Sequence, residues 1–141
     1  MEPQELLCDS LGHRFARPQI LAEALTHPSV RSAKGHKLQA YDRLEFLGDR
    51  VLGVVVADDL LRRYRDDEVG AVAPRFNALV RREALAKVAA EIELGRFIAM
   101  SPTEEATGGR AKATILADCC EAVIGALFVD GGLEAAAAFI H

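Results

Sequence analysis

The chain has 141 residues, of which 50% are hydrophobic and 27% charged, with a net charge of −4 at pH 7. This length suits one domain with a proper core, and the composition is ordinary for a soluble globular protein. No apolar run reaches the roughly 18 residues of a membrane span, and the acidic N-terminus is not expected to be a secretory signal. The negative net charge by itself argues against a nucleic-acid binder.

The N-terminal part of the chain is expected to form two short helices. The first covers Gln4–Ser10, and the second covers Gln19–Leu25, with Pro18 well placed at its first position. A turn follows, in which backbone groups are expected to satisfy His27, so that it is not a metal ligand. The polar segment Val30–Ala40 is expected to be a loop.

The central helix is expected to run from about Tyr41 to Tyr64. It places Glu45 and Asp49 four residues apart and therefore on one face. Apolar side chains cover most other directions, so the helix belongs inside the protein. Two carboxylates drawn toward a low-dielectric interior must take up protons, find cationic partners or bind a metal ion.

The next segment is expected to be one helix with a stripe of core residues. An acidic turn over Asp66–Gly70 precedes it, Pro74 starts it and Gly95 ends it. Its apolar residues recur at helical spacing, which indicates packing and not a cofactor site. Ser101–Glu105 has the capping chemistry of a short helical turn, and Thr107–Arg110 is expected to be a mobile loop.

A second helix with paired carboxylates is expected over Ala113–Val129. Its only charges are Asp118 and Glu121, three residues apart and so on one face. The two carboxylate helices could approach closely if small residues lined their contact. Glycines that would allow this stand at Gly48, Gly53 and Gly125.

The end of the chain is expected to turn at Gly131 and Gly132 and to begin a further helix over Leu133–His141. No strand alternation, internal repeat or low-complexity segment is present, so the predicted architecture is all-α. The three cysteines lack metal-ligand spacing and are interpreted as reduced core thiols of a cytoplasmic protein.

The chemistry suggested by these residues is that of a metal site. Packed together, the two helices would bring four carboxylates to one point, and none of the four histidines lies on either helix. Oxygen-only ligation favours Mg²⁺ or Mn²⁺, which usually handle phosphate esters. A metal-dependent phosphodiesterase or phosphatase is therefore the best interpretation. The alternative is a structural carboxylate network paired with arginines such as Arg43 and Arg50.

Several segments resemble the ribonuclease III family. Asp42–Asp49 (Asp-Arg-Leu-Glu-Phe-Leu-Gly-Asp) resembles the hallmark motif of that family, and Ile115–Ala126 resembles its other long motif. Leu25–Ser29, Leu79–Arg81 and Glu93–Gly95 resemble further landmarks in the same order. The resemblance spans nearly the whole chain and is closest to bacterial ribonuclease III.

The resemblance implies that residues 1–141 are an all-α catalytic domain that cleaves double-stranded RNA in rRNA and mRNA processing, leaving 5′-phosphate and 3′-hydroxyl ends. Glu45, Asp49, Asp118 and Glu121 would be the metal cluster, with Asp49 and Glu121 mattering most for hydrolysis. One or two Mg²⁺ ions, replaceable by Mn²⁺, would activate the attacking water and stabilise the departing oxygen. No organic cofactor and no membrane are expected. Two alternatives are a non-catalytic dimerisation or RNA-binding module and a phosphohydrolase of small nucleotides.

The resemblance also implies a two-fold homodimer, whose symmetry would match that of an antiparallel duplex. Phe46 would anchor the interface in a socket of the partner, with Asp42 beside it. The alternative for Phe46 is an ordinary core residue of its own chain. Arg110 and Lys112, just before the second carboxylate helix, are expected to contact the RNA backbone.

This sequence departs from the family pattern in three places. Asp42 stands where the family often has Glu, and Val69 stands where it often has an acid, so an inter-subunit or second-metal role of that acid is in doubt. The C-terminal double-stranded-RNA-binding domain that family members usually carry is absent from this chain. RNA binding is therefore expected to be weak and strongly salt-dependent.

Overall fold

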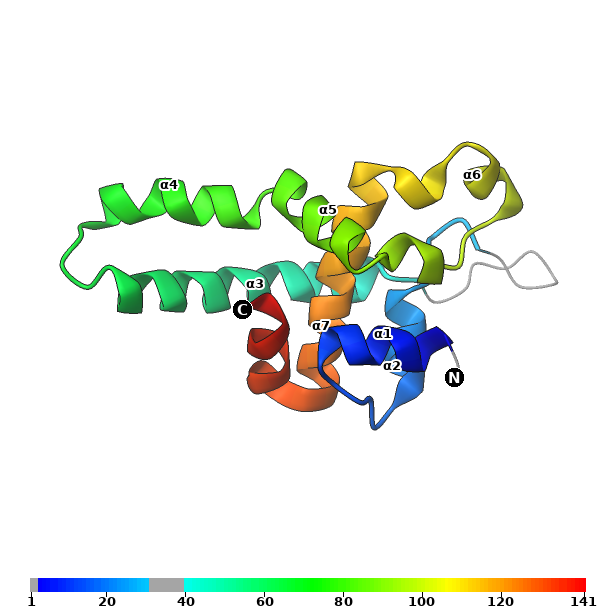
Figure 1. The fold of residues 1–141 in the computed structure, drawn as a ribbon, viewed down its shortest axis with the longest axis horizontal. Helices are drawn as coiled ribbons and strands as arrows, with labels where there is room; N and C mark the ends of the chain where they lie inside the picture. The colour runs from blue at the N-terminus through cyan, green and yellow to red at the C-terminus, as the bar shows by residue number, and fades with distance from the viewer. Residues whose placement is uncertain (1–2, 31–39) are drawn as a thin grey trace.

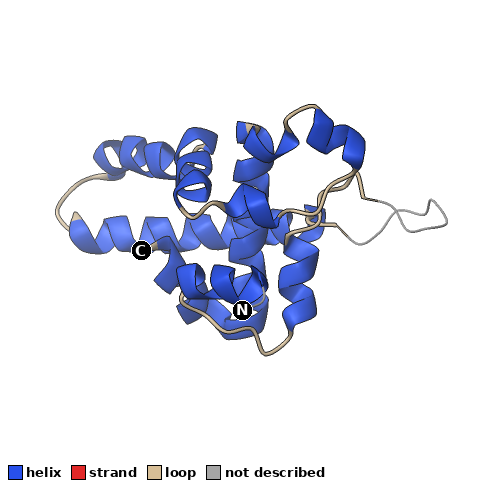
Figure 2. Ribbon diagram, turned by 45° about the vertical axis from the view of Figure 1, so that its right-hand side comes forward, coloured by secondary structure: helices blue, strands red, loops and turns tan. Residues whose placement is uncertain are grey.

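The computed structural model describes residues 3–30 and 40–141. Within these ranges it contains seven α-helices and two 3-10 helices and no strand beyond one isolated parallel bridge, between Thr26 and Ala99. Figure 2 shows this helical architecture, which confirms the all-α prediction. The loop predicted over Val30–Ala40, with its bases Arg31, Lys34 and Lys37, lies almost wholly outside the described residues.

Two long helices, α3 and α7, organise the fold. Figure 1 shows α3 and α4 as the arms of a long antiparallel hairpin, with α7 crossing α3. The short helix α2 packs on both α7 and α3, whereas α6 lies away from the crossing, at the upper right of Figure 1. The elements are α1 (Pro3–Leu11), α2 (Pro18–Ala24), α3 (Asp42–Arg63), α4 (Val69–Val80), α5 (Arg82–Glu91), η1 (Leu94–Phe97), α6 (Pro102–Ala106), η2 (Gly109–Ala111) and α7 (Ala113–Ile140).

The crossing of α3 and α7 depends on two glycines. A Cβ atom at Gly48 would overlap the carbonyl oxygen of Glu121, and a Cβ atom at Gly125 would overlap the backbone of α3. The predicted close approach is therefore confirmed at these two positions. The prediction is wrong for Gly53, where an added Cβ would meet only the Phe76 ring, at 3.8 Å.

The first half of α7 is the centre of the core. Ala117, Cys119, Val123 and Leu127 are at most 2% exposed, and the thiol of Cys119 donates to the carbonyl oxygen of Ala24, with 3.4 Å between sulfur and oxygen. Cys119 and the other two cysteines are free, which agrees with the predicted reduced thiols. Packing of this helix supplies much of the apolar burial that stabilises the fold.

Among the described helices, α7 is the only one long and apolar enough to cross a membrane, judged by length and composition. This test tolerates two charged residues, so it does not contradict the expectation that no uninterrupted apolar run reaches the length of a membrane span. The apolar residues of α7 are interrupted by Asp118, Glu121 and Asp130. A buried core helix passes the same test, and the segment from Ile115 to Leu127 is mostly buried. The helix also breaks at Gly132 (φ 75°, ψ −172°). This break confirms the predicted end at the glycine pair and the further helix after it.

The segment predicted as one helix after the acidic turn is two helices. Helix α4 begins at Val69 and contains Pro74 instead of starting there. Arg81 leaves the helical conformation (φ −78°, ψ 161°) and separates α4 from α5. The break lets α5 leave the hairpin and pack on α7, where Leu85 and Ala89 become buried. Burial of these apolar side chains offsets the loss of one continuous helix.

The connection between α5 and α7 consists of short, well-defined turns. Gly95 does not end a helix but lies in η1, with its Cα against the backbone of Arg110. Ser101 caps α6 as predicted, because its hydroxyl accepts a hydrogen bond from the backbone N–H of Glu104 at 3.1 Å. The predicted mobile loop is instead a left-handed turn at Gly108 (φ 81°) followed by η2.

A buried carboxylate fastens the N-terminal segment to α7. The Asp130 side chain is 1% exposed and accepts hydrogen bonds from His13 Nε2 at 2.8 Å and from the backbone N–H groups of Ala16 and Arg17 at 2.9 and 3.0 Å. Burial raises the pKa of Asp130, but these hydrogen bonds outweigh it and leave the pKa lowered. This contact holds the residues between α1 and α2 against the end of α7.

Candidate metal centre

The predicted carboxylates meet where α3 crosses α7. One oxygen from each of Glu45, Asp118 and Glu121 lies within 4.8 Å of the other two. Glu45 comes from the first turn of α3, and the other two come from the second and third turns of α7. The same depression is lined by Asp49, the fourth predicted ligand. Helical spacing therefore placed all four acids correctly on facing sides of two helices.

The carboxylates lie in the wall of an open depression, so the expectation that they point into the interior was too strong. Glu45, Asp118 and Glu121 are partly buried, whereas the Asp49 side chain is 55% exposed. Asp49 stands outside the tight cluster of three but close enough to Glu121 to interact with it. The site thus consists of three converging carboxylates and a fourth at the rim.

Crowding of these acids changes their acidity. Burial, the charge of Asp118 and a hydrogen bond with it raise the pKa of Glu45 to about 7. Burial and a hydrogen bond with Asp49 raise the pKa of Glu121 to about 8. Burial also raises the pKa of Asp118. Because the ionised cluster is unfavourable by itself, its oxygen-only donor set fits a hard divalent cation.

The alternative of an arginine-neutralised network is not supported by the described residues. Arg50 Nη1 lies 3.4 Å from Asp49 Oδ2, in an exposed pair that gains little stability. The guanidinium of Arg50 also stacks over the Phe46 ring at 3.8 Å. Within the part of the chain that the structure describes, no ion pair joins Arg43 to any acid, and none reaches Glu45, Asp118 or Glu121.

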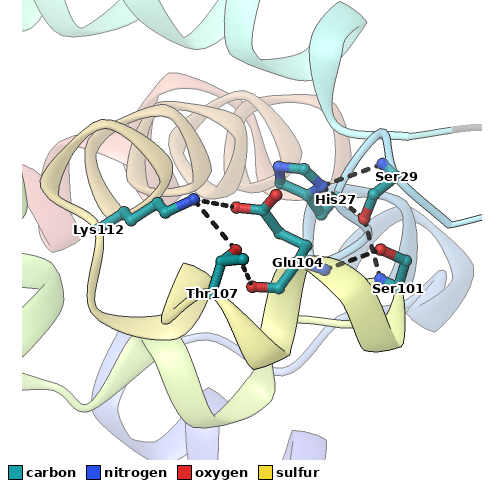
Figure 3. A network of polar contacts seen from close by, with 6 residues as sticks. All are labelled: His27, Ser29, Ser101, Glu104, Thr107 and Lys112. Carbon is teal, nitrogen blue, oxygen red and sulfur yellow. Dashed lines mark hydrogen bonds and ion pairs between the residues drawn. The ribbon is translucent and has the colours of Figure 1, made fainter.

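A chain of polar contacts holds the start of α7 in place (Figure 3). His27 Nδ1 accepts a hydrogen bond from the backbone N–H of Ser29 at 3.0 Å, so the predicted turn histidine is confirmed. The Ser29 hydroxyl oxygen accepts one from the backbone N–H of Ser101 at 2.9 Å. Further along, Lys112 Nζ donates to Glu104 Oε1 at 2.8 Å. These contacts link the turn after α2 to the residue before α7.

The two bases predicted to contact RNA have partners inside the protein. Arg110 Nη1 donates to the carbonyl oxygens of Gly95 at 2.9 Å and Ile98 at 2.7 Å, and its Nε donates to Glu105 at 3.0 Å. Lys112 Nζ pairs with Glu104, and the Lys112 side chain is 45% exposed. Both side chains therefore position the start of α7, and their contact with RNA stays a prediction.

One face of α3 carries large apolar side chains without cover in the single chain. Phe46, Val54 and Leu61 are 65%, 59% and 54% exposed, and their spacing places them on one side of the helix. The interpretation of Phe46 as a core residue of its own chain is therefore wrong. Asp42 is exposed and, together with Phe46, lines both the carboxylate depression and a second depression. Val69, where the family often has an acid, begins α4 with 74% of its surface exposed.

One residue of the depression was missed. Arg82 is not among the residues that the sequence analysis singles out, but the structure places it in the carboxylate depression. It is the first residue of α5, directly after the backbone break at Arg81. Arginine is a good helix former, so the residue types around this position gave no signal of the break.

The raised pKa values predict how stability depends on pH. EDTA keeps metal ions from binding to the carboxylates. Between the ordinary pKa of a glutamate and these raised values, Glu45 and Glu121 are ionised in the unfolded chain but protonated in the folded chain. Their contribution to stability is thus present at low pH and lost as pH rises through the folded pKa values. We expect the Tm to fall between about pH 5 and pH 8, and Glu121→Gln to reduce the fall. Thermal unfolding at several pH values checks this, and an equally steep fall in Glu121→Gln would contradict it.

Known proteins resemble this chain over most of its length. The sequence model of a family described as ribonuclease-III-like matches residues 17–141. Ribonuclease 3 of Dinoroseobacter shibae is 52% identical over 133 residues, which is 94% of this chain and 57% of that protein. Ribonuclease 3 of Rhodobacter capsulatus is 48% identical over 132 residues, again 94% and 57%. The chain thus spans a little over half the length of these curated relatives.

Solved structures agree with the sequence matches. Two structures of the nuclease domain of ribonuclease III from Campylobacter jejuni are 39% identical to this chain, with TM-scores of 0.88 and 0.89. They cover 96% and 99% of this chain, which in turn covers 91% of each. One of the two is described as showing structural flexibility in a region involved in dimer formation. The fold therefore has close counterparts of known structure.

Proposed function

Because this chain belongs to the ribonuclease-III-like family, we propose that residues 1–141 are the catalytic domain of a metal-dependent endoribonuclease. Its substrate is double-stranded RNA, its products carry 5′-phosphate and 3′-hydroxyl ends, and it acts in cytoplasmic processing of ribosomal and messenger RNA. The observation that carries this proposal is the meeting of Glu45, Asp118 and Glu121 within 4.8 Å, with Asp49 beside them.

The carboxylate cluster would hold the cation. Glu45, Asp118 and Glu121, which converge within 4.8 Å, would be its direct ligands, and Asp49 at the rim would complete the set. Mg²⁺ suits four carboxylates, and Mn²⁺ can replace it, because both prefer oxygen ligands. When bound, the cation supplies the Lewis-acid chemistry needed for phosphodiester hydrolysis.

The residues at the open side of the depression would act on the reacting groups. Asp49 is 55% exposed and lies against Glu121, so both carboxylates can accept hydrogen bonds from a water molecule that enters there. Holding that water beside the scissile phosphate lowers the entropic cost of attack. This placement supports the proposal, which the resemblance to the ribonuclease III family implies, that Asp49 and Glu121 matter most for hydrolysis.

The shape of the site favours a polymer over a small nucleotide. Sites for small molecules are usually concave and largely enclosed, whereas this depression is open and one of its acids is mostly exposed. A duplex could lie across such a surface with one phosphate at the carboxylates. The presence of all four acids argues against a non-catalytic module of the same fold.

Incubation with a short RNA duplex tests the proposed function. We expect endonucleolytic cleavage with Mg²⁺, no cleavage with EDTA, and little cleavage of single-stranded RNA of the same sequence. End-labelling of the products would report the 5′-phosphate. Turnover of a small phosphate ester without preference for duplex RNA would instead identify a small-molecule phosphohydrolase.

The functional unit is proposed to be a homodimer. Phe46, Val54 and Leu61 form an exposed apolar face on α3, and such a face is commonly covered by a partner. A two-fold dimer presents one carboxylate cluster to each strand of an antiparallel duplex. Asp42 is expected near the interface because it lines a depression with Phe46. The Campylobacter nuclease domain, whose description mentions dimer formation, supports this arrangement.

Replacing Phe46 with Ala is expected to weaken dimerisation at least thirtyfold, because buried aromatic anchors contribute about 2 kcal/mol or more to interfaces. The monomer should stay folded, since Phe46 is 65% exposed in the single chain. Sedimentation equilibrium would measure the dissociation constant. Leu6→Ala, at another exposed apolar residue, is the control. Equal dimerisation of the Phe46→Ala protein and the wild type would count against this interface.

A further inference from the structure

Arg82 has a position unlike that of the neighbouring bases. It is the first residue of α5 and lines the depression that contains the four carboxylates. Arg81, one residue earlier, adopts extended backbone, does not line the depression, and pairs with Glu83 at 3.3 Å between Nε and Oε2. The backbone break between α4 and α5 therefore separates two adjacent arginines into different environments.

The Arg82 guanidinium is free of protein partners within the described residues. No ion pair or side-chain hydrogen bond of those ranges involves it, although five acids, Asp42 and the four predicted ligands, line the same depression. It also does not neutralise the cluster, because the pKa values of Glu45 and Glu121 remain raised. Its charge lowers the pKa of Asp118 without cancelling the effect of burial.

A guanidinium in this position suits an anion that enters the depression from solvent. Its planar fork of N–H donors matches the oxygens of a phosphate and binds them in pairs. An RNA backbone held against the carboxylate cluster would place non-bridging phosphate oxygens at the same rim. A base here would also balance the repulsion between that backbone and the exposed Asp49 carboxylate.

We propose that Arg82 is a substrate-binding residue that contacts a backbone phosphate of the RNA at, or next to, the bond being cut. This inference rests on the proposed function. The alternative is that Arg82 serves only as a counter-ion for Asp118. The two roles differ in measurable ways, because a phosphate contact changes RNA binding whereas a counter-ion changes only the binding of the metal.

The test compares Arg82→Gln with Arg81→Gln. Cleavage is measured with each change in the wild-type background. RNA binding is measured with each change combined with Glu121→Gln, so that the RNA is not cut. For Arg82→Gln we expect about tenfold weaker binding of a short RNA duplex and a salt dependence that is shallower by about one unit of slope. In the cleaving protein, KM should rise more than kcat falls. Arg81→Gln should change none of these values.

Titration of Mn²⁺ without RNA separates the outcomes. If Arg82→Gln alters Mn²⁺ affinity but leaves the salt slope and duplex affinity unchanged, Arg82 is a counter-ion and the inference is overturned. If the wild type neither binds nor cuts duplex RNA, the proposed function itself fails. Unchanged thermal unfolding of Arg82→Gln would show that any loss of binding is not caused by misfolding.

Discussion

Glu121→Gln is expected to abolish cleavage of duplex RNA while leaving the fold intact. The change removes one charged oxygen ligand from the cluster of three and the proton acceptor beside Asp49. We expect kcat to fall by roughly a thousandfold, about 4 kcal/mol of transition-state stabilisation. Gln has nearly the shape of a protonated Glu, and the raised pKa of Glu121 makes the neutral form acceptable to the fold.

Single-turnover cleavage at saturating Mg²⁺ would measure this loss, and thermal unfolding would verify the fold. Glu134→Gln removes an exposed carboxylate from the part of α7 that follows the break at Gly132 and should retain full activity. Near wild-type cleavage by Glu121→Gln would show that the carboxylate cluster is not the reaction centre.

Gly48→Ala is expected to destabilise the protein severely. The added Cβ would overlap the carbonyl oxygen of Glu121, which belongs to the backbone of α7 and cannot rotate away. Relief requires the two helices to separate, so we expect a loss of at least about 3 kcal/mol, the upper range for overpacking. The separation would also move Glu45 away from Glu121, so metal binding should weaken together with stability.

Gly53→Ala provides a matched control on the same helix. Its added Cβ would meet only the Phe76 ring at 3.8 Å, an ordinary contact. Because Ala has the higher helix propensity, we expect Gly53→Ala to stabilise by about 0.5 to 1 kcal/mol. Urea unfolding of both variants gives the two values. Equal effects at the two positions would mean that Gly48 does not set the helix spacing.

Much of the site was predictable from local spacing. Glu45 and Asp49 lie one helical turn apart, and so do Asp118 and Glu121, so each pair shares a face wherever the helices pack. Gly48 stands between the first two acids and marks the side of α3 that meets α7. Local spacing thus accounts for the two acids of each pair sharing a face, whereas the meeting of the two pairs follows from the packing of α3 on α7.

Other features depended on tertiary packing and could not be predicted. The apolar character of α3 shows that it is largely covered, but not which side remains open, so the exposure of Asp49 was missed. Nothing in the residue types around Arg81 indicates a helix break, because the break is stabilised by packing of α5 on α7. The position of Arg82 follows from that break. Pro74 was expected to start a helix, but the turn at Glu68 starts it earlier.

Calorimetric titration of the protein with Mn²⁺ tests most directly whether acids from α3 and α7 share a cation. The wild type should bind Mn²⁺, and Mg²⁺ should compete for the same site. The double variant Glu45→Gln/Asp118→Asn, which removes one ligand from each helix, should bind at least about tenfold more weakly and still unfold cooperatively. Equal Mn²⁺ affinity in the wild type and the folded double variant would contradict a shared metal site between the two helices.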